Sequence, residues 1–187
     1  HIMTHYHSKD TYSSIKIDRL SLDWHELITY MMEVGTNGFD ADFKFWDRSI
    51  CKILIMLSIE IQLDYLKEDI VCELGELGYK TLMEWESSPY YVFSDKLFRA
   101  CGTVPSGKLL TFTGNCDVNE LLHIAAYLNI TARNHPLISN IKSYCDNNRG
   151  KRGGDDTFQT VSDNIIHILN GGTFAGWVNS LDMVFSQ

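Results

Sequence analysis

The sequence predicts an α+β protein in which an antiparallel sheet is backed by helices. Residues 39–45 alternate between apolar and polar side chains, which is the period of a β-strand. Residues 109–130 carry apolar side chains at the spacing of a long helix. Strand and helix signals are interleaved along the chain, and hairpin signals are also present, which favours an α+β layer over a doubly wound sheet.

The first elements are a helix and a strand. The helix is expected to begin at Ser21 or Asp23, since either can cap it, and Gly35 and Gly38 are expected to end it. The strand directs its apolar residues to one face, and these are Phe39, Ala41, Phe43 and Phe45. Asp42 is therefore expected on the polar face, near the end of the strand.

The remaining elements follow in order. Residues 48–80 are typical of helix with a break near Lys67, and 89–93 and 97–98 are short strand candidates. A Gly/Pro/Ser loop at 101–108 precedes the helix over 109–130, which residues 134–136 break. Residues 146–154 predict a charged, glycine-rich turn, and 157–161 a strand. The C-terminal part predicts a short helix at 165–169, a hinge at 171–172, a helix at 174–181 and a strand at 183–185.

Composition limits the possible classes of protein. A chain of 187 residues with 44% apolar content can fill one core, and its length argues for one domain. A net charge of −8 argues against a free-standing nucleic-acid binder, unless the chain is the metal-binding part of a larger enzyme. Five scattered cysteines without a CxxC pair make a disulfide framework or a zinc site improbable. The most apolar stretch, residues 50–63, is too short to span a bilayer, so no transmembrane segment is expected.

Two acidic signatures indicate a metal centre. Asp42 precedes Asp47 by five positions, and Gly154-Asp155-Asp156 comes much later in the chain. Magnesium prefers carboxylate oxygens, and two such ions roughly 3.5–4 Å apart catalyse phosphoryl transfer. Asp42 and Asp155 are the expected bridging ligands from neighbouring strands, with Asp156 in support. Clustered carboxylates without metal should raise at least one pKa. Taken alone, the Gly-Asp-Asp triplet also fits an ordinary solvent turn.

A third signature has a more specific spacing. Ser106-Gly107 is followed by Thr111 and Asn115, and the last two are four residues apart on one helix face. Glycine beside serine permits an unusual loop or a close backbone approach to a ligand. The polar groups of Thr111 and Asn115 could hold Asp47 and a ribose hydroxyl. The alternative is a Ser/Gly loop that leads into a helix, with Asn115 merely solvated.

In this order, the three signatures resemble the palm region of viral RNA-dependent RNA polymerases, in particular those of picorna-like positive-strand viruses. Residues 39–48 resemble motif A, 102–130 motif B, 150–161 motif C and 165–187 motif D. The resemblance implies a palm over residues 21–187, with part of the fingers inserted between motifs A and B, after an expression remnant and lead-in at 1–20. It implies template-directed RNA synthesis, with two Mg²⁺ or Mn²⁺ ions held by Asp42, Asp155 and Asp156.

The same resemblance implies the other functions of the site. Asp47 and Asn115 would recognise the ribose of the incoming NTP, with Thr111 helping to fix them, and Ser106-Gly107 would touch template and nucleotide. The implied partners are RNA template and primer, the remaining fingers and thumb, and other viral replication proteins, at replication complexes in the host cytoplasm. A lysine that follows motif D in the family would lie beyond Gln187.

The sequence departs from the family before motif C. Gly153 stands where a bulky residue is usual, and the charged segment 147–152 stands where the family has an apolar strand. Two alternatives therefore stay open. One is a catalytically silent palm fragment that serves as a scaffold or interaction domain. The other is a reverse transcriptase, against which Asp47 and Asn115 argue, because those enzymes typically exclude the 2′-hydroxyl with a bulky gate.

Overall fold

The computed structural model describes residues 20–64, 67–100 and 111–186, and these form two compact units. Unit 1 contains the described residues up to Lys44 and those from Asn119 onward, whereas unit 2 contains those of Phe45–Val118. Unit 2 is thus inserted between two parts of unit 1 in the sequence. Mixed helices and antiparallel strands confirm the α+β prediction, including an insertion after the first strand.

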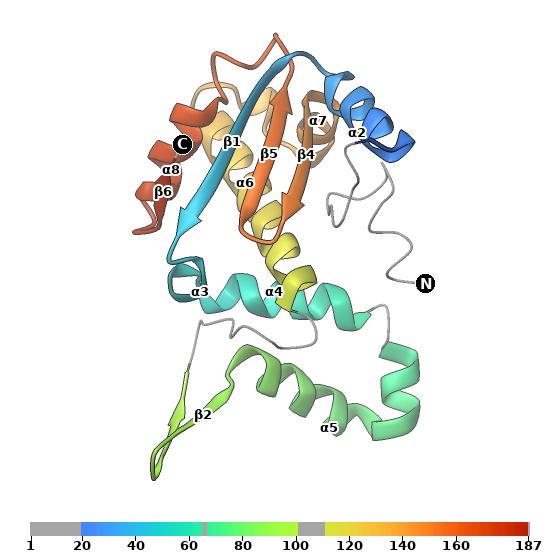
Figure 1. The fold of residues 1–187 in the computed structure, drawn as a ribbon, viewed down its shortest axis with the longest axis vertical. Helices are drawn as coiled ribbons and strands as arrows, with labels where there is room; N and C mark the ends of the chain where they lie inside the picture. The colour runs from blue at the N-terminus through green and yellow to red at the C-terminus, as the bar shows by residue number, and fades with distance from the viewer. Residues whose placement is uncertain (1–19, 65–66, 101–110, 187) are drawn as a thin grey trace. The chain divides into compact units, whose positions relative to one another are not determined.

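Unit 1 is built on a four-stranded sheet with the strand order β4-β5-β1-β6. Its strands are β1 (Asn37–Lys44), β4 (Asn148–Gly153), β5 (Asp156–Val161) and β6 (Val184–Ser186). All three strand pairs are antiparallel, and Figure 1 shows β1, β5 and β4 side by side. β1 contains the strand predicted at 39–45 except its last residue, and β6 matches the strand predicted at 183–185 to within one residue.

Helices cover both faces of this sheet. On one face lie α6 (Thr111–Asn134), α7 (Ile141–Asn147) and α8 (Gly171–Asn179). The residues of α6 from Asn119 onward belong to unit 1. A 3-10 turn, η1 (Pro136–Ile138), follows α6. On the other face, α2 (Leu22–Met32) packs against β4 and β5. Ser21 is its N-cap and accepts a hydrogen bond from the Trp24 amide, so the first of the two expected caps is the one used.

The core of unit 1 lies between the sheet and α6 with α8. Phe39, Ala41 and Phe43 are buried as the alternation of β1 predicted. His123 of α6 stacks on Phe174 of α8, with ring centroids 4.1 Å apart. Phe45, in contrast, does not continue the alternation: it is 68% exposed and adopts a left-handed φ of 58° as the N-cap of α3 (Trp46–Ser49). The chain turns sharply at this residue, which ends the strand.

The charged, glycine-rich segment at 146–154, which the sequence predicted as a turn, is mostly a strand. Asn148–Gly153 forms β4 and pairs with β5 from Asn148↔Val161 to Gly153↔Asp156. Because side chains alternate across a strand, Arg149 and Lys151 face one side and Arg152 the other. The cations of Arg149 and Lys151 lie 5.4 and 5.0 Å from the ring centroid of Tyr30 on α2. The positive charges of Arg149 and Lys151 therefore lie against the Tyr30 ring, so a strand can carry them.

Two predictions near the C-terminus are wrong. Residues 163–168 form turns and not the short helix expected at 165–169. Gly171 and Gly172 are not a hinge, because they form the first turn of α8 behind a capping box made by Asn170 and Thr173. The cap determines where this helix begins, in spite of the low helix propensity of glycine.

Unit 2 contains α3, α4 (Lys52–Asp64), α5 (Lys67–Ser87) and a hairpin of β2 (Tyr90–Phe93) and β3 (Lys96–Arg99), with the first residues of α6. The break expected near Lys67 and both short strands are confirmed. Asp117 of α6 is buried and accepts hydrogen bonds from Ser58, at 3.2 Å, and from Gln62 on α4. These bonds fix α4 against α6 within the unit.

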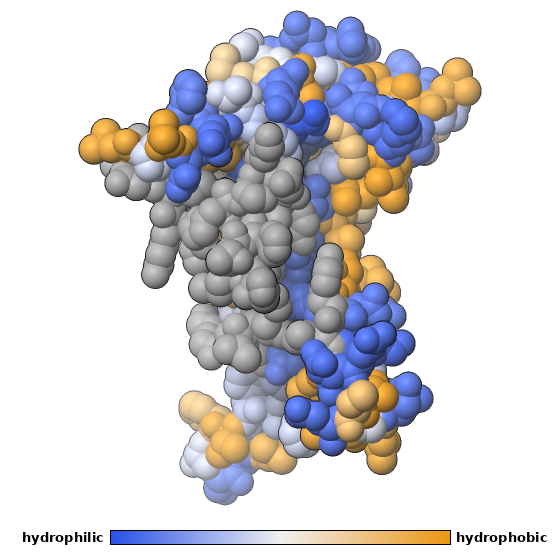
Figure 2. All heavy atoms as spheres, turned by 90° about the vertical axis from the view of Figure 1, so that its right-hand side faces the viewer, coloured by the Kyte–Doolittle hydropathy of each residue, from blue (hydrophilic) through white to orange (hydrophobic). Residues whose placement is uncertain are grey.

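Hydrophobic side chains also reach the surface. Figure 2 shows them among hydrophilic ones on one face of the molecule. The hairpin of unit 2 exposes several, namely Tyr90, Val92, Phe93, Leu97 and Phe98. Within residues 20–64, 67–100 and 111–186, no helix combines the length and apolar character needed to cross a bilayer.

Candidate metal centre and nucleotide site

Asp42 lies on β1 where the sequence predicted it. Its side chain is exposed on the sheet face opposite Phe39, Ala41 and Phe43. The last pair of the β1–β5 ladder is Ala41↔Thr157. Continued by one residue, this register sets Asp42 opposite Asp156, on the same face of the sheet. Residues separated by more than a hundred positions in the sequence are thereby brought together.

Asp155 and Asp156 occupy the tip of the β4–β5 hairpin. Gly153 pairs with Asp156, so Gly154 and Asp155 form a two-residue loop. Gly154 has a φ of +82°, which only glycine adopts at little cost, and the pattern matches a type II′ hairpin turn. Asp155 is partly exposed and Asp156 is exposed. The Gly-Asp-Asp triplet is therefore a hairpin turn beside β1 and not an isolated solvent turn.

The charges of these three carboxylates interact. Partial burial of its carboxylate, followed by the negative charges of Asp155 and Asp42, raises the pKa of Asp156. A raised pKa is the behaviour expected of clustered carboxylates without metal. A divalent cation would remove the repulsion, since it offers a positive charge to all three groups.

The donor set fits magnesium, although the side chains are not yet arranged around an ion. Three carboxylates supply the hard oxygen ligands that Mg²⁺ and Mn²⁺ prefer. Among the residues that the structure describes, no group of three or more His, Cys, Asp or Glu side chains is arranged to hold a metal. Metal binding would therefore require rotation of these exposed side chains toward one another.

Sequence reasoning missed the buried polar network beneath this hairpin. Arg152 is fully buried, forms an ion pair with Glu120 at 2.8 Å, and donates to Thr157 at 2.7 Å and Gln159 at 2.8 Å. A buried arginine needs such partners, because an unpaired buried charge is strongly unfavourable. A signal for this network was present in the sequence. Asn148, Gly150 and Arg152 alternate as residues on one face of a strand do, and the following strand carries Gln159, a polar partner for that face.

His123 belongs to the same network. Its ring nitrogen Nε2 lies 3.2 Å from the Thr157 hydroxyl. Complete burial, with the positive charge of Arg152 nearby, lowers the pKa of His123 well below its ordinary value. The ring is therefore neutral at physiological pH and packs as a core aromatic group against Phe174.

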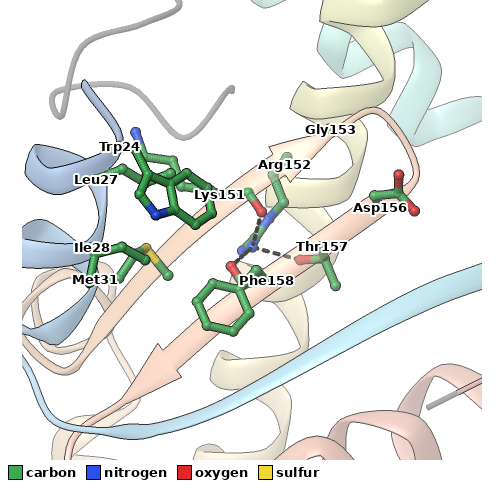
Figure 3. Close-up of a pocket in the computed structure, with 10 residues that line it drawn as sticks. All are labelled: Trp24, Leu27, Ile28, Met31, Lys151, Arg152, Gly153, Asp156, Thr157 and Phe158. Atoms are coloured by element: carbon green, nitrogen blue, oxygen red, sulfur yellow. Dashed lines mark hydrogen bonds between the residues drawn. The ribbon is translucent and has the colours of Figure 1, made fainter. Parts of the chain in front are cut away.

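A pocket of about 430 Å³ lies between α2 and the β4–β5 hairpin (Figure 3). Its wall is mostly apolar and includes Trp24, Leu27, Ile28, Met31 and Phe158. Asp156 is at its border, near the turn, and Arg152 reaches across the hairpin behind it. The pocket thus borders Asp156, but its apolar wall does not offer the oxygen ligands that the carboxylates provide.

The residues predicted to recognise ribose lie in unit 2. Asp47 is exposed in the first turn of α3, and Thr111 and Asn115 lie in the first turns of α6. The Oδ1 atom of Asn115 is buried and has no hydrogen-bond partner among the described residues. An unpaired buried acceptor is unfavourable, so it is suited to a donor such as a hydroxyl. Ser106 and Gly107 lie outside the described residues.

The chain belongs to the viral RNA-dependent RNA polymerase family, whose model matches residues 1–176. This agrees with the order of the acidic signatures and with their place at one end of an antiparallel sheet. The resemblance to a picorna-like polymerase palm is thereby confirmed, as is the α+β fold class.

The chain is 28% identical over 180 residues to the genome polyprotein of Deformed wing virus, covering 92% of this chain and 6% of that polyprotein. It is 25% identical over 170 residues to the replication polyprotein of Nora virus, covering 90% of this chain and 8% of the relative. It shares the fold of the Sicinivirus 3Dpol RNA-dependent RNA polymerase, with a TM-score of 0.62, 16% identity, and coverage of 94% of this chain and 33% of that one. The chain therefore spans less than a tenth of the polyproteins and a third of the solved polymerase.

Proposed function

We propose that this chain is the palm of a longer RNA-dependent RNA polymerase, which transfers nucleotidyl groups from NTPs to an RNA 3′ end on an RNA template. The observation that carries the proposal is the meeting of Asp42 with the Gly154–Asp156 turn. The negative charges of Asp42 and Asp155 both act on Asp156. Family membership gives this acidic cluster its chemical interpretation.

Asp42 and Asp155 would hold two Mg²⁺ or Mn²⁺ ions, and Asp156 would assist. When bound, such ions would supply Lewis-acid activation at an attacking 3′-oxygen and charge neutralisation at the leaving pyrophosphate. The role of these protein residues would be to bind the ions and to orient them. The β1–β5 ladder ends at Ala41, and Asp42 itself pairs with Ser186 of β6, so the sheet fixes its backbone. The hairpin turn fixes the backbone of Asp155. Positioning and charge neutralisation are most of what phosphoryl transfer requires from a protein.

Asp47, Thr111 and Asn115 would select a ribonucleotide by its 2′-hydroxyl, and Ser106-Gly107 would contact template and nucleotide. Asn115 Oδ1, which has no hydrogen-bond partner within residues 20–64, 67–100 and 111–186, supports a role as acceptor for that hydroxyl. Sites that bind a substrate hydroxyl by hydrogen bonds discriminate strongly against an analogue that lacks it. The implied partners are RNA template and primer, further fingers and thumb regions, and other viral replication proteins, at replication complexes in the host cytoplasm.

Titration with Mn²⁺, followed by electron paramagnetic resonance, tests the metal centre. Wild type is expected to bind Mn²⁺, and Asp155→Ala to bind it at least about 10-fold more weakly, because a ligand is lost. Asp40→Ala is the matched control, since Asp40 is exposed on the same strand and face as Asp42 but pairs with Phe158, away from the turn. Equal binding by wild type and Asp155→Ala would contradict the proposal.

A catalytically silent palm, acting as a scaffold, is the second candidate. It is favoured by the lack of a preformed three-ligand metal group among the described residues. Primer extension by the full-length protein that carries this chain separates the two candidates. Elongation with Mg²⁺ that Asp155→Ala abolishes supports the polymerase, whereas Mn²⁺ binding without any elongation supports the silent palm.

A further inference from the structure

Asn119 of α6 holds the turn that carries the metal-binding aspartates. Its side-chain amide Nδ2 donates to the backbone carbonyls of Gly154 at 3.1 Å, Asp155 at 3.0 Å and Asp156 at 3.4 Å. Asn119 is fully buried, with 0% of its surface exposed. Three consecutive carbonyls therefore converge on one side chain from a helix that packs behind the sheet.

The turn needs this donor. Carbonyl groups of a hairpin loop cannot all be paired within the ladder, and a buried carbonyl without a partner costs free energy. An amide nitrogen carries two hydrogens, so the two shorter bonds can each use one and the longest is shared. The Oδ1 atom of Asn119 has no partner among the described residues. The orientation of the amide is thus determined by the three carbonyls.

The attachment has a consequence for the carboxylates. Gly154 adopts a left-handed φ, and the loop that it forms has only two residues, so the conformation of the loop sets the direction of the Asp155 side chain. Fixing the carbonyls on both sides of Asp155 fixes its Cα position relative to α6. Partners of ligand residues commonly set metal affinity in this way.

We propose that Asn119 is a positioning residue that sets metal affinity at Asp155 and Asp156 by fixing the conformation of the Gly154–Asp156 turn. The inference rests on the proposed function, because it assigns Asn119 a role toward the metal site proposed above. Asn119 touches neither the metal nor the substrate in this scheme, and acts through the backbone of the ligands.

Mn²⁺ binding by Asn119 variants tests the inference. Asn119→Leu keeps the side-chain volume but removes the donor, and Asn119→Ala removes both. Each is expected to weaken Mn²⁺ binding about 10-fold, as for other partners of ligand residues. Asn148→Ala is the matched control. Asn148 is a buried asparagine in the same hairpin, but its bonds run to Gln159 and to the Tyr144 carbonyl, at the far end from the turn.

The comparison separates positioning from general stability. All variants are measured well below their unfolding midpoints, and both asparagine sites are expected to lower that midpoint. Weakened binding in a folded Asn119 variant, with wild-type binding in Asn148→Ala, supports the role. If either folded Asn119 variant binds Mn²⁺ as wild type does, while Asp155→Ala does not, the inference is wrong and the proposed metal site stands. If wild type and Asp155→Ala bind alike, the proposed metal site fails first, and the inference fails with it.

Discussion

At the scale of single residues, the charge on Asp156 makes the stability of the metal-free protein depend on pH. Its ordinary pKa is 3.8, and burial and the neighbouring carboxylates raise it in the folded state. Between these two pKa values the folded chain binds more protons than the unfolded chain. The contribution of Asp156 to the free energy of unfolding therefore falls as the pH rises through this interval.

Asp156→Asn should consequently be more stable than wild type at pH 7 without metal, and the difference should shrink as the pH falls through the raised pKa of the folded state toward 3.8, because the carboxyl then becomes protonated. Urea unfolding at several pH values measures the difference. Saturating Mn²⁺ should reduce or reverse the advantage of the variant. A constant difference across the whole pH range would show that the carboxylates do not interact.

Individual residues were predictable where the chemistry requires a particular side chain. Asp42 and the Gly154–Asp156 triplet could be found because metal chemistry needs carboxylates and a II′ turn needs glycine. Asn119 could not be found in this way. Its role depends on three carbonyls that come from a hairpin 35 to 37 residues later in the chain. An asparagine on a helix carries no sign of such a partner.

At the scale of elements, β4 shows how tertiary contacts override composition. Its charges and glycines predicted a turn, because a local pattern cannot show that Glu120, Gln159 and Thr157 receive the Arg152 guanidinium. Elements with strong local signals were predicted well, such as β1 by its alternation and the end of α6 before Pro136. The start of α8 was missed because its Asn170 cap was overlooked beside two glycines.

Arg152→Ala should lower the free energy of unfolding by about 3 kcal/mol, since it removes a buried side chain and leaves the Glu120 carboxylate without a cation, although the Tyr144 hydroxyl still donates to it. Chemical denaturation gives the value. Arg149→Ala is the control from the same strand, because its ion pair with Glu33 is partly exposed and is worth about 1 kcal/mol or less. If both variants lost the same free energy of unfolding, the burial of Arg152 would contribute nothing to stability.

At the scale of the whole molecule, the carboxylates proposed as metal ligands belong to unit 1, and Asp47, Thr111 and Asn115, which are proposed to recognise ribose, belong to unit 2. The sequence indicated an insertion between motifs A and B, and the structure shows a compact unit there. The proposed motif and domain ranges stay predictions. Composition could not locate this division, because both units have apolar cores and the chain has no linker of low complexity.

Metal binding should therefore protect one unit selectively. In hydrogen exchange measured by mass spectrometry, Mn²⁺ should slow exchange in peptides covering β1 and the β4–β5 hairpin, because a ligand that binds the native state stabilises what it contacts. Peptides from α5 should change little. Asp155→Ala should abolish the protection. Equal slowing in α5 would contradict a site confined to unit 1.

The packing of Arg152 also limits how this sequence can diverge. A Cβ atom added at Gly150 would lie 2.6 Å from both terminal guanidinium nitrogens, so the Arg152 guanidinium would have to shift to admit a side chain there. Such a shift would disturb its ion pair with Glu120 and its bonds to Thr157 and Gln159. A residue without a side chain thus leaves the room in which this buried cation is held.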